Sequence, residues 1–340
     1  MLVREVGSIY AAGGSAEGAG LEAMGLQYVD YALWQRDMLA PLLEPQREYW
    51  RTQLHEGALS VLELPLDFAR PAVQTFNGAM AAVRLPADVV ERLEVLGRAH
   101  GCTLFQVVLA LWSLLLCRHA GQDEVVIGSP YHGRDAAGTE GLIGYFVNVL
   151  ALLVEAPRGR CVTALLRSAR SAASDGIRHS WVPFQSVVHE LLPHQPHDAS
   201  RNAVFQAMMG WEAVRGFVAG VGDDIFGSAL EVSPMNAGEH RVAKCDATLE
   251  VSNVSEEGID GFIEFNTDLF ERRSVEQLSE RLAVLAGALA DAAPSTDAWS
   301  LLMLLADESE NTRGTFWPRA WSGQIDREQL RASAAAARAA

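Results

Sequence analysis

The sequence predicts an α/β fold in which helices pack on a mixed β-sheet. From residue 79 onward, stretches with helical and strand periodicity alternate along the chain. The nearly continuous apolar runs EVVIG at 124–128 and VNVLALLV at 147–154 are typical of strands covered on both faces. Two later runs, 248–254 and 259–266, alternate in polarity around the turn SEEG and predict an antiparallel hairpin. Strands of both kinds in one chain indicate a mixed sheet.

Composition places the chain among globular proteins with a substantial core. It has 340 residues, of which 49% are hydrophobic and 21% charged, enough for one large domain or two subdomains. The net charge of −16 argues against a nucleic-acid partner. The longest apolar run, 107–117, is far shorter than the roughly 20 residues of a membrane span, and the N-terminus has no signal-peptide core. We expect a cytoplasmic protein without membrane or nucleic-acid partners.

The first 78 residues predict two helical segments and a linker. Residues 1–12 have the pattern of the end of a helix, and the small residues that follow are typical of a loop. Aromatic side chains at helical spacing predict a helix over 27–50. The proline-containing stretch LELPLDFARP at 62–71 predicts a linker that continues to the first strand.

The next elements are defined by their ends. A short strand is predicted at 79–85, and Pro86 then opens a helix that ends at Gly101. Thr103 is the expected N-cap of an apolar helix that ends at Gly121. Because this second helix is apolar on several faces, we expect it to be buried.

Weaker patterns complete the α/β prediction. Ser274, with Gln277 three residues later, has the spacing of a capping box and predicts a helix from there to Ala292. Beyond Pro294 the periodicity fades. The remaining predicted elements are helices at 163–179 and 184–192 and a strand at 204–211.

Common catalytic motifs are missing. The sequence has no Gly-Lys pair for a phosphate-binding loop and no GxSxG turn for a serine hydrolase. Its four cysteines show no CxxC spacing. His189, His194 and His197 lie close together in HELLPHQPH, but the two prolines and the irregular spacing favour a loop over a metal site. We therefore expect no metal site.

Polar residues at the ends of apolar segments carry a family resemblance. Taken together and in this order, seven segments resemble motifs of the condensation domains of nonribosomal peptide synthetases. The resembling segments are YVDYALW at 28–34 (YxDYAxW), IGSPYHGR at 127–134 ((I/V)GxPxxxR), IGYFVNVL at 143–150 ((I/V)GxFVNTL), HSWVPFQSVV at 179–188 (HQDVPFExLV), DASRNAVFQ at 198–206 (DxSRNPLFQ), KCDATLEV at 244–251 (KFDLTL) and GFIEFNTDLFERRSVEQL at 261–278 (YNTDLF).

This resemblance, which covers residues 1 to about 292, implies a chloramphenicol acetyltransferase-like fold: a mixed sheet with flanking helices in each of two lobes that enclose a tunnel. Residues 1–61 are then expected to be a remnant of the N-terminal subdomain and 62–78 a linker. Residues 79–292 are expected to form the C-terminal subdomain, and 293–340 a linker or tail.

One family motif does not occur in this sequence. The motif HHxxxDG, whose second histidine is tied to amide formation in the family, is absent, and no two histidines are adjacent. In the family it lies just upstream of a helix that resembles LVREVGSIYAA at 2–12. We therefore expect the N-terminal lobe to be largely missing and the chain to have no catalytic residue of its own.

The resemblance also implies partners and a set of site residues. In the family a donor thioester and an acceptor amine are carried on the 4′-phosphopantetheine of carrier domains, so peptidyl carrier domains and the adenylation domain of the same synthetase are the expected partners, with no bound cofactor. By motif match, Arg134 would pair with the aspartate of the missing motif and would otherwise lack its buried partner. Asn148 would lie near the tunnel, Asn202 near the loop that closes over it, and Ser129 in the same motif as Arg134.

Three functions remain open on sequence alone. The first is a fragment of an amide-forming condensation domain that is inactive by itself. The second is a non-catalytic lobe that binds carrier proteins or acts as a scaffold. The third is an acyltransferase that assembles with another chain supplying the histidine motif.

Overall fold

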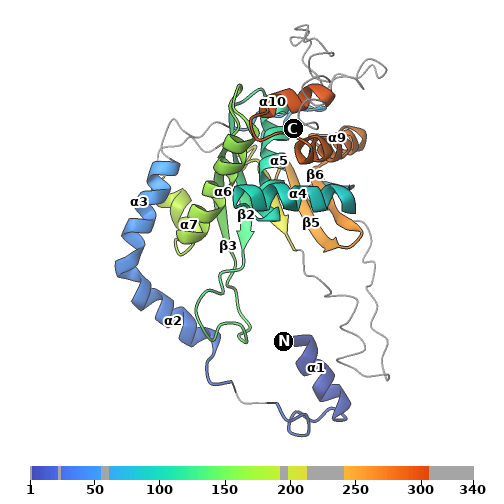
Figure 1. The fold of residues 1–340 in the computed structure, drawn as a ribbon. Coiled ribbons are helices and arrows are strands. Elements are labelled where there is room, and N and C mark those ends of the chain that lie inside the picture. Colours follow the sequence, from blue (N-terminus) through green and yellow to red (C-terminus); the bar gives the residue numbers. More distant parts are fainter. Residues whose placement is uncertain (1, 22–23, 55–60, 192–197, 213–240, 306–340) are drawn as a thin grey trace.

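The computed structural model describes residues 2–21, 24–54, 61–191, 198–212 and 241–305. A six-stranded sheet with helices packed on it forms the main body, and a helical arm extends from that body (Figure 1). The α-helices are α1 (Leu2–Ala11), α2 (Tyr28–Leu39), α3 (Leu43–Gln53), α4 (Ala87–His100), α5 (Leu104–Ala120), α6 (Val162–Arg178), α7 (Phe184–Ser186), α9 (Arg272–Ala290) and α10 (Ala298–Leu301). Shorter helical turns are η1 (Ala40–Leu42), η2 (Val187–Leu191) and η4 (Leu302–Leu305), and the strands are β1 (Gly78–Pro86), β2 (Glu124–Tyr131), β3 (Asn148–Glu155), β4 (Ala207–Trp211), β5 (Ala247–Ser255) and β6 (Gly258–Asn266).

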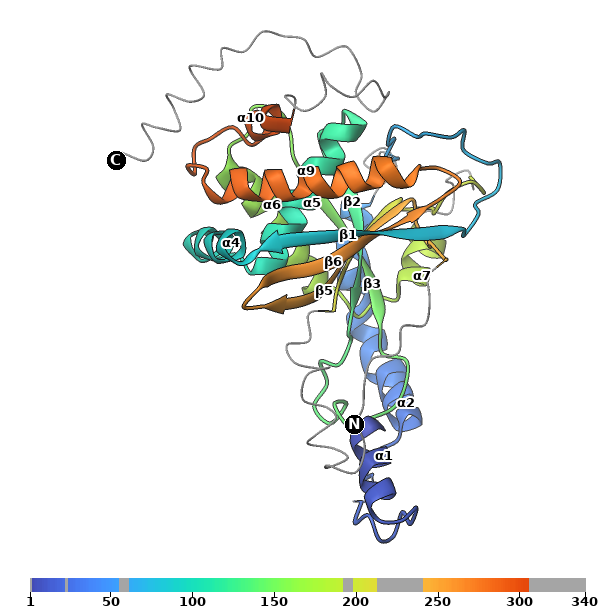
Figure 2. The same cartoon turned by 90° about the vertical axis from the view of Figure 1, so that its right-hand side faces the viewer.

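The sheet is mixed, as predicted. Its strand order is β1-β6-β5-β4-β2-β3. β4 runs parallel to both β2 and β5, while the other neighbouring strands pair antiparallel. Helices α5, α6 and α9 contact β2, β3 and β1 respectively, so they cover the sheet along its width (Figure 2). The α/β class and the β5–β6 hairpin are therefore confirmed.

Helix α5 forms the centre of the core, as its apolar faces predict. Trp112 is fully buried, and its indole N–H donates to the carbonyl of Met208 on β4 (3.2 Å). At the helix start, the Thr103 hydroxyl accepts the Gln106 N–H and the Gln106 side chain accepts the Thr103 N–H. The helix ends at Gly121, whose φ of 70° lies in the left-handed region that favours glycine.

The predicted start of α9 is wrong. The helix begins at Arg272 with Glu271 as its N-cap, and Ser274 lies inside the first turn. Tertiary contacts set this start: the Glu271 N–H donates to the Asp67 carboxylate (2.9 Å), and the Arg272 guanidinium donates to the carbonyl of Met80 (2.8 Å). Contacts with distant segments thus override the local capping signal.

Two other boundaries also differ from the prediction. The helix expected over 27–50 is interrupted at η1, where Pro41 occupies the start of a 3₁₀ turn and α3 begins separately. β4 begins at Ala207 rather than at residue 204. Gln206 instead uses its side chain to accept the Leu62 N–H and to donate to the carbonyl of Asn202.

Residues 62–78, predicted as a linker, run across the body without regular structure before β1. Their backbone is nevertheless held along its length. Asp67 and Phe68 both donate N–H groups to the carbonyl of Leu269 (3.0 and 3.2 Å), and Gln74 donates its N–H to the carbonyl of Ala199 (2.7 Å). We call residues 62–78 the strap, because they tie α3 to the body.

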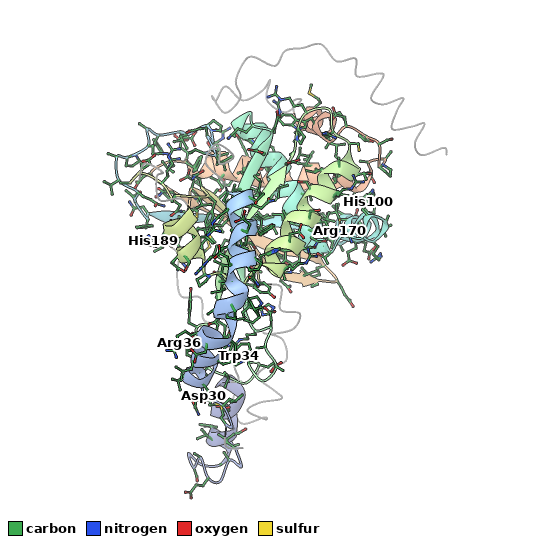
Figure 3. All side chains as sticks on the ribbon, turned by 90° about the vertical axis from the view of Figure 1, so that its left-hand side faces the viewer. Asp30, Trp34, Arg36, His100, Arg170 and His189 are labelled. Atoms are coloured by element: carbon green, nitrogen blue, oxygen red, sulfur yellow. The ribbon has the colours of Figure 1, made fainter. Side chains whose placement is uncertain are left out.

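The strap is preceded by the arm formed by α2 and α3. Asp30, Trp34 and Arg36 on α2 lie away from the main body, whereas His100 and Arg170 lie on it (Figure 3). The Asp30 carboxylate accepts the Gln27 N–H (2.8 Å), which orders the first turn of α2. The other end of the arm is fixed to the body, because the Trp50 indole donates to the carbonyl of His179 (2.9 Å).

The two outer strands of the sheet, β1 and β3, have polar contacts on their free edges. On β1, the carbonyl of Met80 accepts from Arg272 and the carbonyl of Ala82 accepts from the Ser279 hydroxyl (2.6 Å). On β3, the Glu155 N–H donates to the Ser168 hydroxyl of α6 (2.8 Å). Helices α9 and α6 therefore use side chains to satisfy backbone groups at both sheet edges.

In the described ranges, no single helix is long and apolar enough to cross a bilayer. α4 and α5 reach the necessary length only as a pair, and the chain bends by 102° between them.

Candidate functional site

The four residues that the family resemblance singles out hold different parts of the fold together. Ser129 lies buried on β2, and its hydroxyl donates to the carbonyl of Met209 on β4 (2.9 Å). This bond continues the contact between two parallel strands beyond their backbone pairing at Ile127 and Gly128. A Cβ on Gly128 would lie only 2.5 Å from the ring of Phe205, so glycine allows this ring to pack directly on β2.

Arg134 has partners that the sequence does not reveal. Its guanidinium donates to the backbone carbonyls of Thr139 and Leu142 and lies 4.1 Å from the centroid of the Phe146 ring. Carbonyl oxygens thus satisfy N–H groups of the Arg134 guanidinium without a carboxylate, and its pairing with the aspartate of the absent motif stays a prediction. Arg134 closes the loop between β2 and β3, which we call the β2–β3 loop (residues 132–147).

The side-chain amide of Asn148 forms every hydrogen bond available to it. Its nitrogen donates to the carbonyls of Ser180 and Val182, both at 2.8 Å. Its oxygen accepts the N–H groups of Val149 (2.9 Å) and Phe184 (3.0 Å). This network fixes the start of β3 against residues 179–184.

Asn202 lies beside Lys244 and Cys245, which come just before β5. Its amide donates to the carbonyl of Lys244 (2.9 Å) and contacts the sulfur of Cys245 (3.1 Å). Next to it, Arg201 forms ion pairs with Glu63 of the strap and with Asp198, each at 2.9 Å. The DASRN segment thus connects the strap to β5.

Arg70 and Asp246 form a buried ion pair that sequence reasoning missed. The guanidinium donates to both carboxylate oxygens, at 3.0 and 2.5 Å, and also to the carbonyl of Ser200. Only 11% and 4% of the two side chains are exposed. A bidentate geometry combined with burial makes this pair a specific attachment of the strap to β5. The sequence signal was the aspartate in KCDATLEV, which gives no indication of a partner 176 residues away.

Histidine titrates near neutral pH and is a common proton carrier, so the surroundings of the histidines bear on what the site can do. Burial, followed by the charges of Arg281 and Arg118, lowers the pKa of His119 to about 3, so this imidazole is neutral near pH 7. His179 stacks on the ring of Tyr49 with 4.0 Å between centroids. His189 lies in η2, whereas His194 and His197 fall outside the described residues. Among the residues that the structure describes, no group of three side chains could hold a metal ion.

The carboxyl group of Glu250 has an unusual environment. It lies over Gly210 of the neighbouring strand β4, where a Cβ would overlap the carboxylate. Burial, and then the negative charges of Glu212 and Glu264, raise the pKa of Glu250 to about 7, while Lys244 opposes the shift. This side chain therefore titrates near neutral pH.

We expect this titration to make the protein less stable as the pH rises from 4.5 to 7. The folded protein retains the Glu250 proton above the ordinary pKa of 4.5, so unfolding releases a proton in this range and its free energy falls with pH. Because the group is partly solvated, the loss should be on the order of 1 kcal/mol. Urea unfolding at pH 5 and 7 measures it. Glu250→Gln should flatten the profile and Glu91→Gln, on the exposed side of α4, should not; an unchanged slope in Glu250→Gln would contradict this assignment.

A surface cavity of about 360 Å³ lies apart from these residues, between α3, α6 and the end of β3. Its floor includes Leu153, Ala156 and Leu165, and its rim includes Arg160 and Arg167. None of Ser129, Arg134, Asn148 and Asn202 lines it. These four residues instead hydrogen-bond to different segments: Ser129 to β4, Arg134 within the β2–β3 loop, Asn148 to residues 180–184 and Asn202 to Lys244.

A family model and several curated proteins match this sequence. The model described as Condensation domain matches residues 1–310. Malpinin synthetase of Mortierella alpina is 36% identical over 278 residues, which are 82% of this chain and 3% of that protein. Surfactin synthase subunit 1 of Bacillus subtilis is 32% identical over 303 residues, 89% of this chain and 8% of that protein. The chain thus spans less than a tenth of the length of these relatives.

Solved structures agree on the fold. The X-domain from teicoplanin biosynthesis superposes with a TM-score of 0.72 at 22% identity, covering 87% of this chain and 66% of that one. A four-domain nonribosomal peptide synthetase bound to AMP and glycine gives a TM-score of 0.64, also at 22% identity, over 93% of this chain and 24% of that one.

Proposed function

This chain belongs to the condensation-domain family, and from that premise we propose that it serves amide bond formation in a nonribosomal peptide synthetase. The reaction joins a carrier-bound acyl or peptidyl thioester to a carrier-bound aminoacyl amine. The amine nitrogen attacks the thioester carbonyl, the new C–N bond replaces the C–S bond, and the amine gives up a proton as the thiol leaves. The observation that supports this proposal best is the ordered series of family motifs within the 310 matched residues.

The partners follow from the same premise. The substrates would be carried on the phosphopantetheine of peptidyl carrier domains, and an adenylation domain would load them, all within the cytoplasm. Tethering both substrates converts their encounter into a nearly intramolecular step, which can contribute several kcal/mol to the rate.

We further propose that these 340 residues do not form the amide by themselves. A base with a pKa near 7 suits the proton transfer, and the family places that role near a histidine of HHxxxDG, which this sequence lacks. Arg134, Asn148 and Asn202 each donate hydrogen bonds to backbone carbonyls of the fold. The contribution of this chain would be the scaffold of one side of the substrate tunnel.

The absent motif favours one second candidate, a non-catalytic lobe that binds carrier proteins. In that case the chain would bind a loaded carrier domain without catalysing a reaction.

The test uses two carrier proteins, one loaded with a donor acyl group and one with an acceptor amino acid, and mass spectrometry of the carrier-bound products. We expect no amide from the chain alone and amide formation when an N-terminal condensation lobe containing HHxxxDG is fused before Met1. Product from the unfused chain would overturn the proposed dependence on that motif. Carrier binding in titration calorimetry without product from the fusion would favour the non-catalytic lobe.

A further inference from the structure

Helix α2 and the β2–β3 loop meet in an aromatic cluster that is separate from the main core. Tyr31, Leu142 and Phe146 are its buried members, and Tyr28 packs against them. The Phe146 ring lies 4.7 Å from the ring of Tyr31 and 5.1 Å from that of Tyr28, measured between centroids. Two sequence motifs that are more than 100 residues apart, YVDYALW and IGYFVNVL, therefore form one contact.

The packing of Tyr28 against the β2–β3 loop is close and leaves no room for a side chain at position 144. The Tyr28 hydroxyl donates to the carbonyl of Tyr145 (2.6 Å), which fixes the position of its ring. That ring occupies the space where a Cβ on Gly144 would lie. On the other side, Arg134 covers Phe146 and binds the loop carbonyls. The loop is thus held between α2 and its own arginine.

A second set of contacts returns from the loop to the arm. Asn148, which directly follows the loop, binds the carbonyls of Ser180 and Val182. Between these two residues, the Trp181 ring packs edge-on against Trp34 of α2 at 6.2 Å, and the Trp181 N–H donates to Gln46 of α3 (3.1 Å). Trp181 stands where the family motif has aspartate, so this contact depends on a residue in which the chain departs from the motif. These contacts link α2 to the β2–β3 loop, the loop to residues 180–182 through Asn148, and those residues back to α2 and α3 through Trp181.

We propose that α2 and the β2–β3 loop form one cooperative unit, anchored at residues 179–184, which opens and closes together while the main core stays folded. The cluster of Tyr31, Leu142 and Phe146 is separate from the main core, and parts of a protein that share their stabilising contacts open locally as a unit. Val182 and Phe184 belong to or pack on the main core, so residues 179–184 are the anchor of this unit. A displacement of α2 is therefore passed to Asn148 and to the start of β3. The proposal concerns the mechanics of the fold and does not depend on amide formation.

Hydrogen–deuterium exchange of the full chain tests this coupling. Gly144→Ala forces Tyr28 away from the loop. We expect about tenfold faster exchange in both α2 and the β2–β3 loop and unchanged rates in β5 and β6, with Gly287→Ala as the matched control because a Cβ there meets no atom within 4 Å. Acceleration restricted to the loop would overturn the proposal.

A second variant tests the contact between Trp181 and α2, and it keeps the proposal testable if the first variant misfolds. Trp181→Leu removes the ring that packs on Trp34 while leaving the loop residues unchanged. If the unit is cooperative, exchange in residues 135–147 should become several times faster although Trp181 is not part of that loop. Exchange in the loop at the wild-type rate would show that the two sides move independently and would overturn the proposal.

Discussion

Replacing Asp246 by alanine is expected to lower the free energy of unfolding by about 3–5 kcal/mol. The substitution leaves the Arg70 guanidinium in a site where only 11% of its side chain is exposed, with the carbonyl of Ser200 as its remaining acceptor. A buried charge without its counter-charge is costly because the protein interior cannot replace its hydration. The strap would also lose its main attachment to β5. Urea unfolding of wild type and variant measures the difference.

The ion pair between Arg84 and Asp260 provides the control. Its charged groups are 2.8 Å apart, but 78% and 39% of the two side chains are exposed, so Asp260→Ala should cost less than about 1 kcal/mol. If Asp246→Ala were as mild as Asp260→Ala, the buried pair would not hold the strap.

The second large effect is expected for Asn148→Asp. The substitution keeps the size of the side chain but replaces the two N–H donors by a carboxylate oxygen that faces the carbonyls of Ser180 and Val182. Each lost bond to a carbonyl costs about 1–3 kcal/mol, and the added repulsion makes a total loss of about 3 kcal/mol or more at pH 7 reasonable.

The pH dependence distinguishes this mechanism from a simple loss of packing. The carbonyl groups raise the pKa of the introduced carboxyl in the folded state, because they favour its protonated, donating form. The destabilisation should therefore be largest above that pKa and shrink as the pH falls through it. Asn148→Ala removes the donors and also the oxygen that accepts from Val149 and Phe184, but it adds no titratable group, so its cost should not follow this pH dependence. A cost of Asn148→Asp that does not shrink as the pH falls would contradict this account of Asn148.

The sequence predicted those elements of the fold that local chemistry determines. The ends of α4 and α5 follow from Thr103, Gly101 and Gly121, whose caps and left-handed backbone involve neighbouring residues only. The start of α9 could not be predicted this way, because Asp67 and Met80 define it from distant parts of the chain. Local signals placed the ends of α4 and α5 correctly, whereas at α9 tertiary contacts overrode the local capping signal of Ser274 and Gln277.

The candidate site shows the same contrast between what local sequence signals predict and what tertiary contacts determine. The motifs selected Ser129, Arg134, Asn148 and Asn202, but the motifs alone do not give the partners of these residues. The bidentate contact of Arg70 with Asp246 and the carbonyl contacts of Arg134 each join groups whose proximity arises only on folding. Arg134 in particular was expected to need a carboxylate, and the β2–β3 loop supplies carbonyls and an aromatic face instead.

The polar contacts on the outer strands have a consequence for solubility. An outer strand with free carbonyl and N–H groups can act as a template for a strand of another molecule, which leads to fibrillar or amorphous aggregation. Arg272 and Ser279 occupy two such carbonyls on β1, and Ser168 occupies an N–H on β3. An incoming strand would first have to displace these side chains. Through these side chains, helices α9 and α6 hinder the pairing of the outer strands with a strand from another copy of the chain.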